Sequence, residues 1–253
     1  MPNNVEGFGK IAIGLRYTKA CSMFMDSWTA LVRDGLRPGD VVMPVVADLP
    51  HHFAAEILLW QFMKTDCDSV LLVDDDHGFE VSLLQRLRDN VVNHSFDVVG
   101  GLYACRRPAY KPILMTWNKT TGEYGMRVPA TPRTTEAVDL LGMGFTLVRR
   151  RVIERLRKDF PGEMLFYWPS DGDGEDATFC KLVSNAGFKI GMDTTSVLDH
   201  QISALVRCNP TKSEVSLETE VNVPFQQYME NMKRERKQAL ENRIARAQKK
   251  EGE

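Results

Sequence analysis

The chain has 253 residues, with 43% hydrophobic and 26% charged side chains. This length suits one large α/β domain with a substantial core, and it permits two domains without requiring them. The formal net charge of −2 excludes a globally basic surface for nucleic acid, although a local basic patch is compatible with it.

Cysteine use and hydropathy predict a compartment. The five cysteines are scattered and form no C-x-x-C pair, as expected for free thiols in a reducing environment. Residues 1–10 lack the basic region and apolar core of a signal peptide, and no apolar run approaches the roughly 20 residues of a membrane span. We therefore expect a cytoplasmic protein.

Apolar runs and helical periods alternate over residues 11–102. The expected elements, in chain order, are strand 11–15, helix 23–33, strand 41–46, helix 52–64, strand 70–73, helix 80–93 and strand 97–102. This alternation predicts an α/β fold with a mostly parallel sheet and helices on both of its faces.

The rest of the chain is more varied. The expected elements are a hairpin of strands 113–117 and 125–128, a helix at 151–158, a helix that opens at 175 and a strand at 196–198. Residues 210–222 look like a polar connector. From Pro224 onward we expect one long basic helix, either a solvated extension or a docking or phosphate-contacting element. The predicted division is a domain over 1–208, then connector and charged helix over 209–253.

The most informative stretch is Ser69–His77, where an apolar run ends on three consecutive aspartates. A strand covered on both faces ends where ligands of an open α/β sheet bind. Adjacent carboxylates repel one another unless solvent, a cation or partial protonation relieves the repulsion. If the strand continues, Asp74 and Asp76 share one side and are candidate ligands for Mg²⁺ or Mn²⁺. The alternative is a polar turn in which Asp76 or a neighbour caps the next helix.

Three later features carry further candidate residues. Gly142-x-Gly144 either lets the backbone approach a ligand or serves a tight turn or bulge. Glu175 and Asp176 follow three aromatics, at 166–168, which form either a platform for a sugar face or part of the core. The two acids are either functional or simple first-turn acids. His200, after the strand expected at 196–198, is a candidate third metal ligand when it is considered together with Asp74 and Asp76.

Taken in order, these motifs resemble the family-2-like glycosyltransferases of the GT-A fold, in the compact form found in bacteria and their phages. The resemblance covers about residues 10–205, and its segments are 71–76, 98–103 with 106–108, 142–150, 174–180 and 198–200. Each motif is common alone, whereas the ordered set is fairly specific. The resemblance implies a single GT-A domain with a mixed, mostly parallel central sheet, followed by a C-terminal helix.

The resemblance also implies donor and metal contacts. Asp74 to Asp76 match the family's Asp-x-Asp motif, in which the last aspartate contacts the metal and the first lies near the donor ribose or the metal's waters. Mn²⁺ or Mg²⁺ would bridge the donor diphosphate and neutralise the leaving group. The implied metal ligands are Asp74, Asp76 and His200. The implied donor contacts are Asp74, Asp75, Arg106, Gly142 and Gly144.

Glu175 and Asp176 match the Glu-Asp motif of inverting members. This match implies that Asp176 is the general base and that Glu175 orients the acceptor or supports the loop. The implied reaction moves a sugar from a nucleotide-sugar donor, a UDP-sugar by default, to a hydroxyl acceptor. Residues 49–56 depart from the Ala-Arg-Asn-like segment of many relatives, which leaves the nucleotide open.

Other functions and several acceptors remain open. A metal-dependent nucleotidyltransferase would also use paired carboxylates at a strand end. A non-catalytic nucleotide- or carbohydrate-binding module would keep the same fold. The acceptor is a glycan, a protein, a lipid, a small molecule or a modified DNA base, because acceptor loops vary independently of the fold.

Overall fold

The structure is a computed structural model that describes residues 8–106, 112–118, 123–126, 134–169, 174–201, 204–209 and 214–219. Five α-helices lie in this part of the chain: α1 (Ser22–Ala30), α2 (His51–Phe62), α3 (Ser82–His94), α4 (Arg150–Asp159) and α5 (Glu175–Asn185). None of these described helices combines the length and apolar character that a bilayer span needs.

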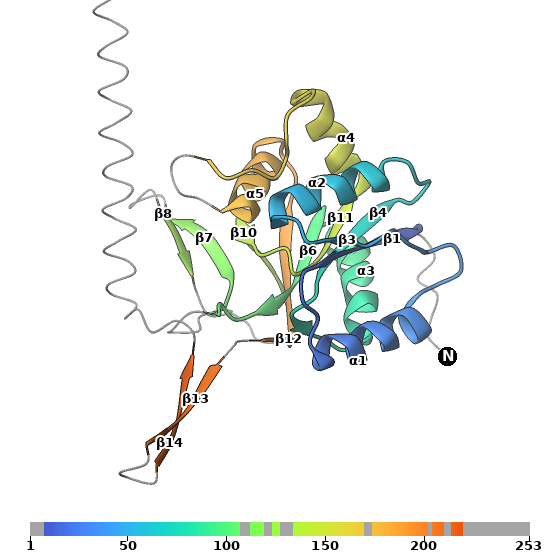
Figure 1. Ribbon diagram of the computed structural model, residues 1–253. Coiled ribbons are helices and arrows are strands. Elements are labelled where there is room, and N and C mark those ends of the chain that lie inside the picture. The colour runs from blue at the N-terminus through green and yellow to red at the C-terminus, as the bar shows by residue number, and fades with distance from the viewer. Residues whose placement is uncertain are drawn as a thin grey trace, which may run out of the picture.

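A nine-stranded sheet forms the centre of the structure (Figure 1). Its strands are β1 (Ile11–Tyr17), β2 (Val41–Val42), β3 (Val46–Ala47), β4 (Ser69–Asp74), β5 (His77–Gly78), β6 (Val98–Tyr103), β9 (Thr135–Ala137), β11 (Phe145–Arg149) and β12 (Ile190–His200). The order is β2-β1-β4-β11-β6-β12-β5, with β3 also paired to β1 and β9 to β12. β5, β9 and β11 run against the other six strands, so the sheet is mixed and mostly parallel, as predicted.

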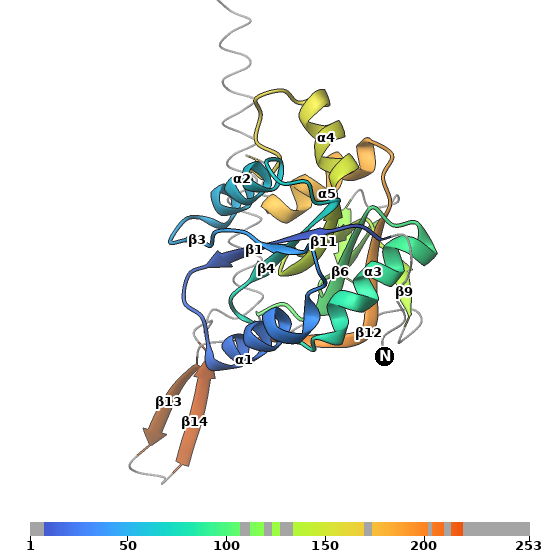
Figure 2. The ribbon, with the colours of Figure 1, turned by 90° about the vertical axis from the view of Figure 1, so that its right-hand side faces the viewer.

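The middle strand β4 shows why this sequence forms a two-faced sheet. Its residues 69–73 are all buried, and successive side chains point to opposite faces. Val70 and Leu72 join the core cluster under α2, α4 and α5, whereas Leu71 and Val73 join the cluster under α1 and α3. Figure 2 shows α2, α4 and α5 above the strands and α1 and α3 below them.

Strand direction decides what lies at one edge of the sheet. The carboxyl ends of β1, β4, β6 and β12 share an edge because these four strands are parallel. β11 runs antiparallel between β4 and β6, so its amino end meets their carboxyl ends. The segment before β11, Gly142–Gly144, therefore enters the sheet edge where the candidate residues gather.

Two predicted elements near the N-terminus need correction. The helix expected over 23–33 ends as α1 at Ala30 and continues as a π-helix over Leu31–Gly35. The strand expected over 41–46 is two short strands, β2 and β3, and both pair with β1. Pro44 lies between them, and a proline has no N–H to donate to a sheet ladder.

Two smaller sheets complete the described part. The predicted hairpin is confirmed as β7 (Leu114–Asn118) and β8 (Glu123–Met126). A third strand, β10 (Leu140–Leu141), pairs with β7 on its other side. β13 (Ala204–Asn209) pairs with β14 (Glu214–Thr219), so the prediction of a polar connector over 210–222 is wrong for the residues of β14. The helix expected from Pro224 lies outside the described residues, and the division at 208/209 stays a prediction.

Candidate active site

The site forms where four parallel strands end. Arg16 is the last residue but one of β1, and Asp74, Tyr103 and His200 are the last residues of β4, β6 and β12. β4 stops at Asp74, and the chain turns through residues 75–76 before β5 begins. Because the strand does not continue, the three aspartates have three different surroundings.

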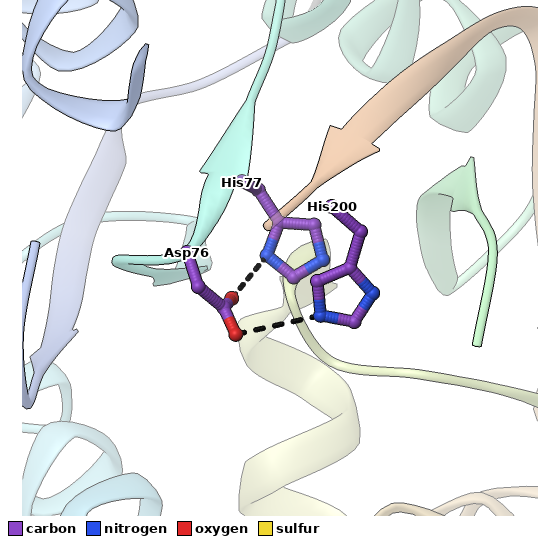
Figure 3. A group of neighbouring side chains, drawn as sticks. All are labelled: Asp76, His77 and His200. Atoms are coloured by element: carbon purple, nitrogen blue, oxygen red, sulfur yellow. Dashed lines mark ion pairs between the residues drawn. The ribbon is translucent and has the colours of Figure 1, made fainter. Parts of the chain in front are cut away.

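His77 is brought to His200 by strand pairing. The short strand β5 lies antiparallel to β12, with His77 directly opposite His200. Their rings stack with centroids 4.3 Å apart. Asp76, at the turn before β5, completes the group, and the ligand atoms of the three residues lie within 4.8 Å of one another (Figure 3). We call Asp76, His77 and His200 the Asp–His cluster.

The hydrogen-bonding pattern of the Asp–His cluster suits a cation. His200 Nδ1 lies 2.7 Å from the carbonyl oxygen of Ala104, which only accepts, so Nδ1 carries a hydrogen. The other nitrogen, Nε2, lies 3.4 Å from Asp76 Oδ2. In the neutral ring this nitrogen presents a lone pair to a carboxylate, an arrangement that a proton or a metal ion between them stabilises.

His77 gives a second sign that a cation fits. Its Nδ1 lies 2.7 Å from Asp76 Oδ1, yet neither ring nitrogen has a well-directed hydrogen bond to any described residue. Buried polar atoms without partners cost free energy, and a metal ion would satisfy them. Burial alone would raise the pKa of Asp76, but the imidazoles of His200 and His77 beside it hold that pKa well below its ordinary value. The carboxylate is therefore ionised and able to bind a metal.

Arg106 lies at the rim of the Asp–His cluster. Its Nη1 donates to Asp76 Oδ2 at 2.9 Å, and the side chain is 55% exposed. The contact brings a predicted donor-binding residue to a predicted metal ligand. The contact of Arg106 with the donor stays a prediction.

Asp74 lies outside the Asp–His cluster. Both of its oxygens are engaged by the fork of Arg16, at 2.6 Å from Nε and 3.0 Å from Nη2. His51 Nδ1, at the start of α2, lies 4.0 Å from Asp74 Oδ1. Metal and donor contacts by Asp74 stay predictions, and an ion at this carboxylate would share it with a buried guanidinium.

Asp75 is buried and stabilises the loop after β1. Its Oδ2 accepts hydrogen bonds from the backbone amides of Thr18, at 2.5 Å, and Lys19, at 2.6 Å. The carboxylate thereby fixes the chain that follows Arg16 and Tyr17. Its predicted contact with the donor stays a prediction.

Gly142 and Gly144 permit close packing by two side chains of the site. A Cβ at Gly142 would lie 2.0 Å from the Tyr103 hydroxyl, and one at Gly144 would lie 2.6 Å from Cε1 of His77. The Tyr103 hydroxyl also accepts a hydrogen bond from the Gly144 amide at 3.1 Å, and Gly144 accepts from the Asp74 amide at 2.9 Å. The two glycines thus have a packing role, while their predicted donor contacts stay predictions.

Asp176 lies on the other side of this glycine segment, at the start of α5. Its Oδ2 accepts from the Met143 amide at 3.2 Å, and its Oδ1 is buried without a hydrogen-bond partner among the described residues. Burial raises the pKa of Asp176 to about 7; Arg16 opposes the rise, whereas the carboxylates of Glu175 and Asp74 add to it. A carboxyl group that titrates near neutrality suits general acid–base chemistry.

The neighbours of Asp176 in sequence are divided between core and surface. Glu175 is half-buried, and its role toward an acceptor stays a prediction. Phe166 is buried and stacks on Phe179 of α5, with ring centroids 4.4 Å apart, so it belongs to the core. Tyr167 and Trp168 are exposed, at 40% and 61%. Of the two alternatives for these aromatics, the core is therefore right for Phe166, and a platform for a sugar face stays open for Tyr167 and Trp168.

Sequence reasoning missed Arg16, His77 and Tyr103. His77 directly follows the aspartate run, and its position was the available signal. Arg16 interrupts the apolar run of β1, a pattern typical of a buried charge that has a partner. For Tyr103, its position at a strand end was the only signal.

Comparisons with known proteins give a fold and no family. No protein-family model matches the sequence, and no curated protein matches it significantly. Among solved structures, the chain is similar to GalNAc-T7 with UDP, GalNAc and Mn²⁺, at a TM-score of 0.53 and 13% identity over 77% of this chain. A197 from STIV matches at a TM-score of 0.48 and 18% identity, over 82% of this chain and 93% of that one.

At these identities, the likeness to GalNAc-T7 bears on the fold alone. The chain spans 44% of the GalNAc-T7 chain, which is therefore much the longer protein. Both the strand order and this similarity agree with the predicted architecture. The protein has a mixed α/β fold with a mostly parallel central sheet, as in GT-A structures.

Proposed function

We propose that this protein is a metal-dependent glycosyltransferase that moves a sugar from a nucleotide-sugar donor to a hydroxyl acceptor. The observation that carries the proposal is the Asp–His cluster, which is joined to Asp176 through the Gly142–Gly144 backbone. The fold, shared with a protein solved with UDP, GalNAc and Mn²⁺, supports the same conclusion and makes a UDP-sugar the default donor.

The Asp–His cluster would hold the metal through one carboxylate oxygen and two imidazole nitrogens. Imidazole ligands favour Mn²⁺ over Mg²⁺, and three protein ligands leave coordination positions for diphosphate oxygens. The bound ion would neutralise charge that develops on the leaving nucleoside diphosphate. Arg106, released from Asp76, would contact the same phosphates through its exposed guanidinium.

Asp176 would act as the base. With a pKa of about 7, it is partly ionised at neutral pH and is able to take the proton of an acceptor hydroxyl at its free Oδ1. A base, rather than a nucleophile, on the acceptor side implies one displacement and inversion at the anomeric carbon. Glu175, on the same helix turn, would orient the acceptor.

Thermal shift with donor nucleotides tests the proposal. Sugars of UDP, GDP, CMP and dTDP are added with and without Mn²⁺ to the wild type, to His77→Gln and to His94→Gln, a control outside the site. One nucleotide at about 100 times its Kd should raise Tm by roughly 5 to 10 °C in the wild type and the control. The rise should require Mn²⁺ and should be lost in His77→Gln.

Turnover separates the three candidate functions. Release of nucleoside diphosphate from the stabilising donor, abolished in Asp176→Asn, supports the transferase. Release of pyrophosphate from a nucleoside triphosphate instead would establish a nucleotidyltransferase. Donor binding that Asp176→Asn leaves unchanged, with no turnover in the wild type, would indicate a binding module.

A further inference from the structure

Arg16 is a charged residue in an apolar part of the sheet. It follows the buried run Ile11–Leu15 in β1, and only 3% of its side chain is exposed. Removing a guanidinium from water costs several kcal/mol unless other groups compensate for the lost hydration. The contacts of Arg16 therefore show what holds it in place.

Arg16 contacts both sides of the candidate site. Nε and Nη2 form a fork with the Asp74 carboxylate, and Nη2 also donates to the carbonyl oxygen of Met143 at 3.1 Å. Nη1 is buried without a hydrogen-bond partner among the described residues. The guanidinium thus joins the end of β4 to the backbone of the glycine segment before β11.

The backbone of Met143 links Arg16 to Asp176. While Arg16 binds the carbonyl oxygen of Met143, the amide of the same residue donates to Asp176 Oδ2 at 3.2 Å. The flanking glycines are pressed against Tyr103 and His77, which restricts rotation of this backbone. The orientation of Met143 is therefore determined on both sides.

We propose that Arg16 is a positioning residue for Asp176. Anchored by Asp74, it holds the Met143 backbone in the orientation whose amide places the Asp176 carboxylate. The inference rests on the proposed function, in which Asp176 is the base. The inference adds that the position of Asp176 depends on Arg16 of β1, although the two side chains share no hydrogen bond.

The chain offers a matched control for Arg16. Arg88, on α3, is also almost fully buried and forms an ion pair with an aspartate, Asp40. That aspartate also accepts from the backbone amides of Ile11 and Arg37, away from the Asp–His cluster. Replacing either arginine by lysine keeps the charge but loses the planar fork, so both changes should lower stability.

Kinetics distinguish positioning from a merely structural role. Arg16→Lys should lower kcat for donor turnover about 100-fold, because a small misplacement of a catalytic group has an effect of that size. The KM for the donor should stay within about threefold of the wild type, since the Asp–His cluster is untouched. Arg88→Lys should lower Tm and leave kcat unchanged.

A second measurement does not depend on activity. Among the residues that the structure describes, the charged and titratable groups around Asp176 are Arg16, Asp74, Tyr103, Glu175 and Cys180. Carboxyl ¹³C NMR of the metal-free protein follows the titration of Asp176 in each variant. Arg16→Lys should raise the pKa of Asp176, because the Arg16 guanidinium and the Met143 amide that it holds both lower this pKa in the wild type, and Arg88→Lys should leave it unchanged.

The outcomes separate this inference from the proposed function. If both lysine variants lose stability alike, and neither changes kcat or the Asp176 titration, Arg16 is structural and the inference fails. If the wild type turns over no donor, the proposed function fails, and the NMR titration still decides whether Arg16 controls Asp176. Should Arg16→Lys not fold, Asp74→Asn, which removes the charge that anchors Arg16, replaces it, and ¹⁵N NMR follows the Met143 amide. A shifted Met143 amide resonance supports the positioning role, and an unchanged one overturns it.

Discussion

Replacing Asp176 by asparagine should stabilise the metal-free protein at neutral and alkaline pH. Burial raises the pKa of Asp176 to about 7, whereas an aspartate in an unfolded chain has a pKa near 3.9. The folded state therefore binds the proton more tightly than the unfolded state. The resulting stability is fully present below about pH 4 and is lost as the pH rises through about 7.

The size of the effect follows from the shift. About three pKa units, at about 1.4 kcal/mol each, correspond to about 4 kcal/mol for ionising this buried carboxyl group. Asparagine stays neutral and resembles the protonated acid in shape. The free energy of unfolding of Asp176→Asn should therefore exceed that of the wild type by an amount that grows between pH 4 and pH 7 and then levels off.

Urea unfolding in the presence of a chelator measures this difference. Between pH 5 and pH 8, the stability gap between Asp176→Asn and the wild type should widen by about 2 to 3 kcal/mol. Asp26→Asn, at an exposed position on α1, is the control and should show a constant gap. A constant gap for Asp176→Asn, or one that narrows with pH, would refute the argument from burial.

Three further predictions concern His77 of the Asp–His cluster and two residues packed around it, Gly144 and Tyr103. Gly144→Ala should weaken Mn²⁺ binding at least tenfold by calorimetry, because its Cβ would lie 2.6 Å from the His77 ring; Gly125→Ala, with nothing within 4 Å of its Cβ, should bind as the wild type does. His77→Gln should also lose about tenfold or more in Mn²⁺ affinity, and unchanged affinity would remove His77 from the cluster. Tyr103→Phe should cost about 1 to 3 kcal/mol in urea unfolding, since the Gly144 amide loses its acceptor; a neutral result would mean that water replaces the hydroxyl.

Local sequence signals predicted the parts of the fold that depend on local structure. The apolar run that stops at Asp74 predicted a central strand, which the structure confirms, and it ends at the sheet edge where the candidate site residues gather. The pattern Glu214–Thr219 alternates polar and apolar residues, a strand period that the polar composition around it concealed. In this segment the alternating pattern was therefore a better guide to secondary structure than the polar composition.

The partners of the site residues depend on the strand order and register of the sheet, which cannot be read directly from the sequence. The partnership of Arg16 with Asp74 requires β1 to lie beside β4 in one particular register. The place of His77 requires the two-residue strand β5 to pair with the end of β12. No periodicity marks a strand that short. The glycines could be read as a turn, a bulge or a ligand contact, and only the fold showed which side chains press against them.

The strand order also has a consequence for synthesis of the chain. His200 ends the last strand of the central sheet, 123 positions after His77 in the chain. A ribosome therefore makes Asp76 and His77 long before their partner His200 exists. A nascent chain cannot assemble the Asp–His cluster until β12 has emerged, so a complete cluster is a sign that translation has passed the whole sheet.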